Sequence, residues 1–243
     1  MNMLFENMQT LIEEYRYKIE LHAHTRPASG CSHLKADELF DGLQTHGYHV
    51  VVLTNHFSGD LDEDDIQEQI DAFTDAKKEA EKHGMTVLLG SEYRLYVDDE
   101  KTEKRDFLVY GVDEDFLWKT GRLPIDSFRE FHDKYCGPDR ILLQAHPMRS
   151  GILVDTAYID GLETYNMCTN DNSACTSVSL HALANNVSIV TAGSDIHEIC
   201  HLGACALRSK VRPENNKELI DLLRSGDYFF EIGGMPVFPH SHF

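Results

Sequence analysis

Apolar runs typical of buried β-strands alternate with helix-like segments about seven times along this 243-residue chain. Three of these runs are VVVL (50–53), ILLQ (141–144) and SIVTAG (188–193). Strands that are apolar along their whole length are buried on both faces, which is typical of a parallel sheet covered by helices. The alternation therefore predicts an α/β domain with a parallel sheet, either open or closed into a barrel.

The two ends of the chain are predicted to add elements outside this alternation. Residues 3–16 carry apolar side chains at helical spacing and predict an amphipathic helix. Residues 212–232 predict a closing helix that stops at Gly226, followed by a final strand. Because this length suits one large core, we expect a single domain over residues 1–243, with its motifs at about 18–200.

Side chains that can bind metals stand where the predicted strands end. The first strand ends in ELHAHT, and the last strong strand leads into GSDIH. In both open sheets and barrels of the α/β class, the active site lies at the carboxyl ends of the strands. We therefore expect seven side chains to meet on one rim: His22, His24, His56, Glu92, His146, Asp195 and His197.

The local spacing of these residues suits metal binding. Residues i and i+2 of a strand point to the same face, so His22 and His24 can hold one ion. Asp195 and His197 repeat this arrangement. Seven ligands exceed the need of one ion, so we expect two or three divalent ions with Glu92 as a bridge. Imidazole and carboxylate ligands accept zinc, manganese and iron alike.

Each of these motifs has a simpler interpretation when it is taken alone. A single H-x-H pair is a weak signal, a histidine after a strand is often a loop residue, and Asp195 could cap a helix. Glu92 could pair with Arg94 on a solvent-exposed face. Together these interpretations require the same coincidence in five strand-like units, whereas one metal centre explains all of them.

The composition argues against several other classes of function. The formal net charge of −19 disfavours tight binding of duplex nucleic acid, which needs a basic surface. No apolar run approaches the roughly 20 residues of a membrane span. The N-terminal segment carries acids and does not resemble a secretory signal, and the six cysteines form no C-x-x-C pair. We therefore expect free thiols and a cytoplasmic protein.

Six short motifs, taken in order, are similar to those of the PHP superfamily, which is named for polymerase and histidinol phosphatase. They are ELHAHT, LTNH, GSEY, AHP, GLETYN and GSDIH, and they span about residues 18–200. The resemblance implies a distorted (β/α)7 barrel, similar to the TIM barrel, with a two- or three-metal site at the strand ends. It also implies metal-dependent hydrolysis of phosphoesters, with a small phosphorylated molecule as the substrate.

Carried over residue by residue, the resemblance assigns ligands to three ions. The implied ligands are, for the first ion, His22, His24, Glu92 and Asp195; for the second, Glu92 and His146; and for the third, His56 and His197. Glu163 and Asn166 match the family's E-x-Y-N segment and would support the ligands rather than bind metal themselves.

The stretch after the first histidine pair departs from the family pattern. Where relatives usually place an aspartate or a histidine for the third ion, this chain has Ser29 and Gly30. Cys31 and His33 are the only nearby substitutes, so the third site is expected to use one of them, or to be weaker or empty. Near the fourth strand, where many members have a histidine, Asp106 precedes FLVYG.

The mechanism that the resemblance implies is in-line attack on phosphorus by a metal-bound water. His197 or His56 is a candidate proton donor if the third ion is absent. Arg26 and Arg149 follow ligand strands and are candidates for binding the phosphate oxygens, although surface ion pairs explain them equally well.

Two other functions stay open at this point. A metal hydrolase of C–N bonds, of the amidohydrolase kind, also has an H-x-H on its first strand. Its bridge is often a carboxylated lysine, and no lysine ends a middle strand of this sequence. A metal-binding sensor or structural module with little turnover is the other alternative, and the missing ligand of the third ion is its best support.

Overall fold

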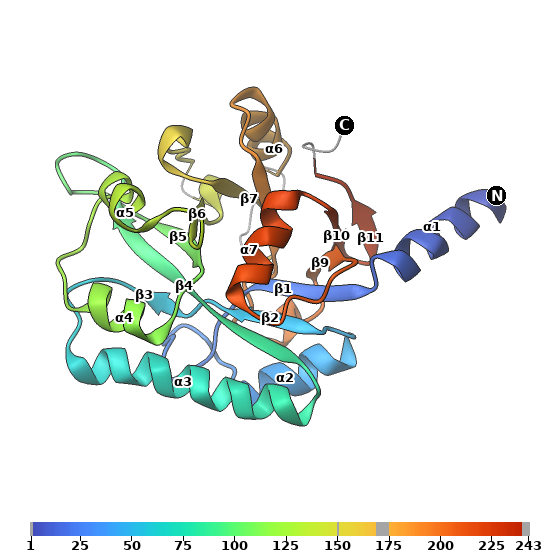
Figure 1. The fold of residues 1–243 in the computed structure, drawn as a ribbon, viewed down its shortest axis with the longest axis horizontal. Helices are drawn as coiled ribbons and strands as arrows, with labels where there is room; N and C mark the ends of the chain where they lie inside the picture. Colours follow the sequence, from blue (N-terminus) through green and yellow to red (C-terminus); the bar gives the residue numbers. More distant parts are fainter. Residues whose placement is uncertain (1, 150, 169–174, 240–243) are drawn as a thin grey trace.

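The main feature of the computed structural model, which describes residues 2–149, 151–168 and 175–239, is one strongly curled mixed sheet with helices around it (Figure 1). The strands are β1 (Tyr17–Ala23), β2 (Val50–Leu53), β3 (His56–Phe57), β4 (Thr86–Tyr96), β5 (Lys104–Tyr110), β6 (Ile141–Gln144), β7 (Gly161–Asn166), β8 (Ile189–Gly193), β9 (Cys205–Ser209), β10 (Tyr228–Ile232) and β11 (Met235–Val237). The α-helices in the described ranges are α1 (Asn2–Glu14), α2 (Ala36–Thr45), α3 (Glu63–Lys82), α4 (Glu114–Gly121), α5 (Phe128–Tyr135), α6 (Cys175–Ala184) and α7 (Asn216–Ser225).

The sheet is so strongly curled that the segment after β8, at one end of the sheet, comes back to β1. The strand order is β11-β10-β9-β1-β2-β4-β5-β6-β7-β8, with β3 beside β4. The backbone N–H of His24 donates to the carbonyl of Ile196 (3.1 Å), and the N–H of Ile196 donates to the carbonyl of His22 (3.1 Å). The segment after β8 therefore lies against β1, which makes the fold a barrel-like α/β structure.

The predicted parallel sheet is only partly correct. β1, β2 and β4 are parallel, and β6, β7 and β8 form a second parallel set. β5 is antiparallel to both β4 and β6. Residues 97–103, which join β4 to β5, are too few for the crossover that a parallel pair requires. β9, β10 and β11 extend the sheet beyond β1 as an antiparallel ribbon that the sequence reasoning did not predict in full.

The helices at the two ends are found with shifted bounds. α1 begins and ends slightly before the predicted range 3–16. The closing helix α7 begins later than residue 212, at a cap where the Asn215 side chain accepts a hydrogen bond from the N–H of Glu218 (3.0 Å). It stops at Gly226, whose φ of 68° is the left-handed conformation that favours glycine.

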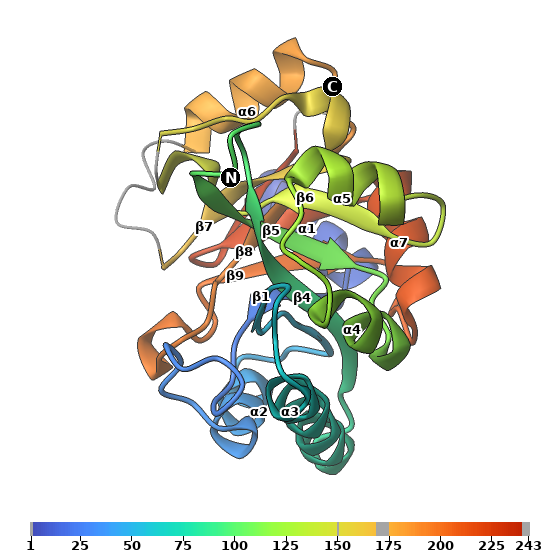
Figure 2. The ribbon, with the colours of Figure 1, turned by 90° about the vertical axis from the view of Figure 1, so that its left-hand side faces the viewer.

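The apolar faces of the helices cover the sheet. α2 buries Leu39, Phe40 and Leu43, and the long helix α3 buries residues such as Ile66 and Ile70. Figure 2 shows α2 and α3 side by side below the strands, with α6 on the opposite side. Within the described ranges, no helix is long and apolar enough to cross a membrane.

The core position of β6 gives a test of this architecture. Leu142 has no exposed surface, so Leu142→Ala should lower the free energy of unfolding by about 2–5 kcal/mol, measured by urea denaturation. Leu123 is 41% exposed, and Leu123→Ala is the control, with an expected change within about 0.5 kcal/mol. Equal effects of the two substitutions would contradict the placement of β6 in the core.

Candidate metal centre

All seven predicted ligands lie in or just beyond strands, and direct contacts link them into one cluster. β1 carries His22 and leads into His24, and the segments after β6 and β8 carry the ligands at positions 146, 195 and 197. Glu92 differs from the prediction because it lies inside the long strand β4 rather than at its end. There it pairs with His56 of β3.

Two of the ligands have strained backbones. The φ angle of His146 is 26° and that of Asp195 is 51°. Non-glycine residues seldom adopt positive φ, and such conformations cost about 1–3 kcal/mol each. The carboxylate of Glu163 accepts a hydrogen bond from the N–H of His146 (2.8 Å), and the backbone bonds of Ile196 to β1 hold the segment at Asp195. The surrounding structure thus fixes both ligands in these conformations.

The central group consists of four buried side chains whose ligand atoms face one another: His22, His24, Glu92 and Asp195. Nε2 of His22 and Nε2 of His24 lie 3.4 and 3.3 Å from Oε2 of Glu92. The same nitrogens lie 3.3 and 3.1 Å from Oδ1 of Asp195. Ligands about 2.0–2.1 Å from a tetrahedral zinc ion are about 3.3 Å apart. The spacing of the central group therefore fits one such ion.

The four facing atoms of the central group form no hydrogen bond, although Nδ1 of His56 lies at an ion-pair distance of 3.0 Å from Oε2 of Glu92. Their residues are at most 1% exposed, so water does not satisfy them either. A buried polar atom without a partner costs roughly 1–3 kcal/mol, and native proteins leave few of them. One cation would satisfy all four atoms at once, so the chemistry of this donor set fits a metal ion.

A second group consists of Glu92, Asp106 and His146. Glu92 takes part in it through Oε1, the oxygen that does not face the central group. Oε1 of Glu92 lies 2.9 Å from Nε2 of His146. Oδ1 of Asp106 is buried without a hydrogen-bond partner, and the guanidinium of Arg94 is 3.5 Å from it. The carboxylate of Glu92 therefore lies between two sets of ligand atoms, as a bridge between two ions requires.

A third group, His24, His56 and His197, lies on the more open side of the cluster. The side chains of His56 and His197 are 37% and 13% exposed. The ring of His24 stacks against both, with centroid distances of 4.6 Å to His56 and 4.4 Å to His197. A fourth group, Cys168, His197 and His201, shares His197 with the third. The sequence reasoning missed Cys168 and His201, because they are far apart in the chain and form no motif.

Cys31 lies beside the third group, and His33 does not. Sγ of Cys31 is 3.1 Å from Nε2 of His197. Burial works to raise the pKa of the Cys31 thiol, but hydrogen bonds with His197 and His56 outweigh it and lower this pKa to about 6. The His33 side chain is 71% exposed and lies 3.7 Å from a carboxylate oxygen of Glu198.

Glu163 and Asn166 contact two of the predicted ligands from behind. Oε1 of Glu163 lies 2.9 Å from Nδ1 of His22. Nδ2 of Asn166 donates to Oε2 of Glu163 (2.9 Å) and to Oδ2 of Asp195 (3.2 Å). A carboxylate that accepts from Nδ1–H leaves Nε2 as the ligand atom, so Glu163 selects the tautomer of His22 that suits metal binding.

The histidines and carboxylates of the central group stabilise each other's charged forms. Burial would raise the pKa values of the Glu92 and Asp195 carboxyls, but the neighbouring histidines keep both well below their usual range. Burial would lower the pKa of His22, but Asp195, Glu163 and Glu92 raise it well above its usual value. A metal ion binds the neutral form of an imidazole, so protonation of His22 and metal binding oppose each other.

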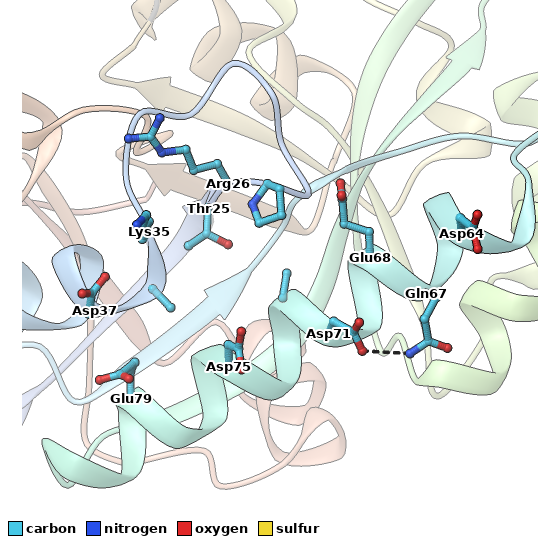
Figure 3. Close-up of a pocket in the computed structure, with 13 residues that line it drawn as sticks. Thr25, Arg26, Lys35, Asp37, Asp64, Gln67, Glu68, Asp71, Asp75 and Glu79 are labelled. Atoms are coloured by element: carbon cyan, nitrogen blue, oxygen red, sulfur yellow. Dashed lines mark hydrogen bonds between the residues drawn. The ribbon is translucent and has the colours of Figure 1, made fainter.

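The two predicted phosphate-binding arginines lie in different surroundings. Arg26 is exposed and lines a groove of about 1060 Å³ together with acidic residues of α3, which Figure 3 shows along one wall. Its backbone N–H donates to the carbonyl of Leu34 (2.9 Å). Arg149 is also exposed, and it ends the short 3-10 turn Pro147–Arg149 that directly follows His146. Of the two, Arg149 is the one joined by this turn to a ligand of the second group.

Solved structures share this fold at low sequence identity. A candidate metal-dependent phosphoesterase from Bifidobacterium adolescentis has a TM-score of 0.53 and 16% identity, covering 76% of this chain and 88% of its own. An amidohydrolase from Chromobacterium violaceum, solved with bound sulfate and no metal, has a TM-score of 0.53 and 14% identity, covering 74% and 87%. A two-domain protein from Bacteroides vulgatus, containing a predicted PHP-like metal-dependent phosphoesterase, has a TM-score of 0.53 and 13% identity, covering 90% and 66%.

The chain has the fold of PHP-like metal-dependent phosphoesterases. The structural matches thus confirm, for the fold, the resemblance that the six motifs carry. No protein-family model matches the chain, and no curated protein matches it.

The unpartnered atoms of the central group predict that metal stabilises the chain. Zinc or manganese at about 100 times its dissociation constant should raise the free energy of unfolding by about 2.7 kcal/mol, and a chelator should reverse this. The measurement is thermal unfolding with and without each ion. His24→Ala should lose the shift, whereas His83→Ala, at the end of α3, should keep it. An unchanged melting temperature with zinc, manganese and iron would contradict the metal centre.

Proposed function

We propose that this chain is a metal-dependent phosphoesterase, a hydrolase that cleaves phosphoester bonds. The observation that carries the proposal is the central group, in which four buried, unpartnered ligand atoms face one another. The fold shared with a candidate phosphoesterase and a PHP-like domain supports the same class. We further propose that residues 1–243 form a single PHP-type domain, built as a distorted (β/α)7 barrel.

The proposed metal ligands are the seven side chains of the cluster: His22, His24, His56, Glu92, His146, Asp195 and His197. Two or three divalent ions of zinc, manganese or iron are the proposed cofactors, because these ions share a preference for imidazole and carboxylate. Ions bound there would lower the pKa of the attacking water and neutralise the charge that develops on the phosphoryl oxygens.

The protein groups around the ligands position them for this reaction. Glu163 holds Nδ1 of His22 and the backbone of His146 with its two oxygens, which couples the central group to the second group. Asn166 holds the oxygen of Asp195 that faces away from the central group. These contacts fix the ligand atoms before a substrate binds, and such preorganisation lowers the cost of reaching the transition state.

His197 and His56 have two possible parts in the reaction. Burial opposes protonation, but hydrogen bonds with Cys168 and Cys31 and the charge of Asp195 raise the pKa of His197 to about 11. Without an ion in the third group, Nε2 of His197 would donate a proton to the leaving oxygen. His56, whose pKa is raised to about 10 by Cys31 and Glu92 against the effect of burial, is the second candidate donor. With an ion in that group, both histidines would be ligands instead.

We propose a small phosphorylated molecule as the substrate. The net charge of −19 repels extended polyanions and makes tight binding of duplex nucleic acid unfavourable, whereas the cations of the metal centre attract a single phosphate. We also propose that the protein acts in the cytoplasm without a membrane partner. In support, all six cysteines are free thiols, as a reducing compartment would keep them.

A hydrolase of C–N bonds is the second candidate, because one of the solved structures with this fold is an amidohydrolase. The bridging group of such enzymes is often a carboxylated lysine, whereas the proposed bridge of this chain is Glu92, which belongs to two of the ligand groups. We therefore favour the phosphoesterase.

Turnover of a chromogenic phosphomonoester in the presence of zinc, manganese or iron tests the proposed reaction. Glu92→Gln should lower kcat/KM by at least about 100-fold, because it weakens the bridge between two ligand groups. Glu81→Gln, on α3, is the control and should leave kcat/KM unchanged.

The outcomes of this assay separate the three functions. A metal-loaded chain that is inactive on phosphomonoesters and phosphodiesters but cleaves an amide would favour the amidohydrolase. A metal-loaded chain that is inactive on all of these would favour a sensor or structural module.

The exposed arginine next to the second group is the proposed phosphate anchor. Arg149→Ala should lower kcat/KM for a phosphomonoester about 10–100-fold, the value of a charge-assisted hydrogen bond. Arg26→Ala should have a smaller effect, since Arg26 lines the acidic groove of Figure 3. Arg122→Ala, which removes a surface ion pair with Glu63, is the control. An unchanged kcat/KM for Arg149→Ala would remove its role as anchor.

A further inference from the structure

The third group lacks the ligand that the family pattern would place after the first histidine pair, and Ser29 does not supply it. Ser29 is 1% exposed, and its hydroxyl is fully used by neighbours. Oγ accepts from the N–H of His56 (2.9 Å), donates to Oδ1 of Asn55 (3.1 Å) and lies 3.3 Å from Nδ1 of His24. Ser29 therefore supports two metal-capable histidines from behind and has no free lone pair for an ion.

The other nearby positions do not supply it either. Gly30 has no side chain, and the imidazole of His33 is 71% exposed beside Glu198. The backbone of this stretch is nevertheless tied to the cluster. The N–H of His33 donates to the carbonyl of His197 (2.8 Å), and Oγ of Ser32 donates to the carbonyl of His24 (3.1 Å). Cys31 is thus carried by a loop that is fixed against two members of the third group.

Cys31 faces the ring atom of His197 that is free to bind an ion. Nδ1 of His197 donates to the carbonyl of Asp195 (2.9 Å), which leaves Nε2 as the ligand atom. Sγ of Cys31 lies 3.1 Å from this Nε2, and His56 lies close to the same thiol. A sulfur and a nitrogen around one tetrahedral zinc are about 3.5 Å apart, so a shift of a few tenths of an ångström would admit the ion.

His24 links the third group to the central group. It has no exposed surface, and it belongs to both groups. Its unpartnered Nε2 faces Glu92 and Asp195 in the central group, so an ion in the third group depends on His56, His197 and Cys31. The ring of His24 stacks against both His56 and His197 and keeps these two imidazoles close together.

We propose that Cys31 is a thiolate ligand of the third group and binds, together with His56 and His197, a divalent ion that prefers sulfur. Thiolates favour zinc and related soft or borderline ions over manganese and magnesium, which prefer oxygen. The ion in this group is therefore zinc-like, even if the second group, which is richer in carboxylates, takes a harder ion. This inference rests on the proposed metal centre and adds a ligand and a metal preference to it.

Cobalt(II) provides a direct test, since a cysteine thiolate bound to cobalt gives a sulfur-to-metal charge-transfer band in the near ultraviolet. The full chain, freed of metal under reducing conditions, is titrated with cobalt while the absorption and the ions bound per chain are measured. The wild type should show the band, and Cys31→Ser should lose it and bind one ion about tenfold or more weakly. Cys168→Ser and Cys200→Ser, the second at an exposed cysteine, should keep the band.

The outcomes separate this inference from the proposed function. Cobalt binding without the band, or a band that survives in Cys31→Ser, would overturn the role of Cys31 and leave the metal centre intact. A band lost in Cys168→Ser but kept in Cys31→Ser would overturn it in favour of the fourth group. A wild type that binds no cobalt would overturn the metal centre itself.

A conservative variant tests the metal preference. Cys31→Asp replaces the thiolate with a hard oxygen ligand, so it should lose the band, keep the number of bound ions and lower the ratio of zinc to manganese affinity about tenfold or more. Competition between the two ions, followed by elemental analysis, measures this ratio. An unchanged ratio would show that Cys31 does not set the metal preference.

Discussion

The carboxylate of Glu92 is the interaction on which the rest of the site depends. Its Oε2 faces His22, His24 and His56 at 3.0–3.4 Å, and its Oε1 faces His146 at 2.9 Å. A buried carboxylate costs several kcal/mol unless charges of opposite sign surround it. The backbone holds this one in place, because β4 pairs with β3 on one side at this residue and with β5 on the other. The central group and the second group both contain Glu92, and two histidines of the third group, His24 and His56, lie within 3.3 Å of its Oε2.

Asp195 is positioned by the closure of the sheet, just as Glu92 is positioned by the pairing of β4 with its neighbours. The segment after β8 hydrogen bonds to β1 on both sides of Ala23, so the first histidine pair and Asp195 share one rim. Gly193 makes this approach possible, since a Cβ there would lie 2.6 Å from both Oε1 of Glu163 and Cβ of His22. The strained φ of Asp195 follows from the same close packing and is offset by the rest of the fold.

The sequence predicted which side chains come together better than it predicted the sheet that carries them. His22 and His24 could be paired from strand periodicity alone, and the histidines and acids after the other strands could be joined to them by one topological rule. The reversed direction of β5 was not predicted, because a strand's direction depends on the length of its connection and not on its apolar pattern. The interior place of Glu92 was also missed, since β4 continues beyond the rim to pair with β5. The contact between Cys31 and His197 joins loops far apart in the chain, and no local spacing encodes it.

The open side of the cluster contains more ligands than it can use at one time. His197 belongs to both the third and the fourth group, but its Nδ1 is bound to the carbonyl of Asp195. Only Nε2 remains, and one nitrogen lone pair binds one ion. An ion held with His56 and Cys31 therefore excludes an ion held with Cys168 and His201. Sγ of Cys31 lies 3.1 Å from this Nε2, and Cys168 also hydrogen bonds with the His197 ring, so the third and fourth groups compete for one nitrogen.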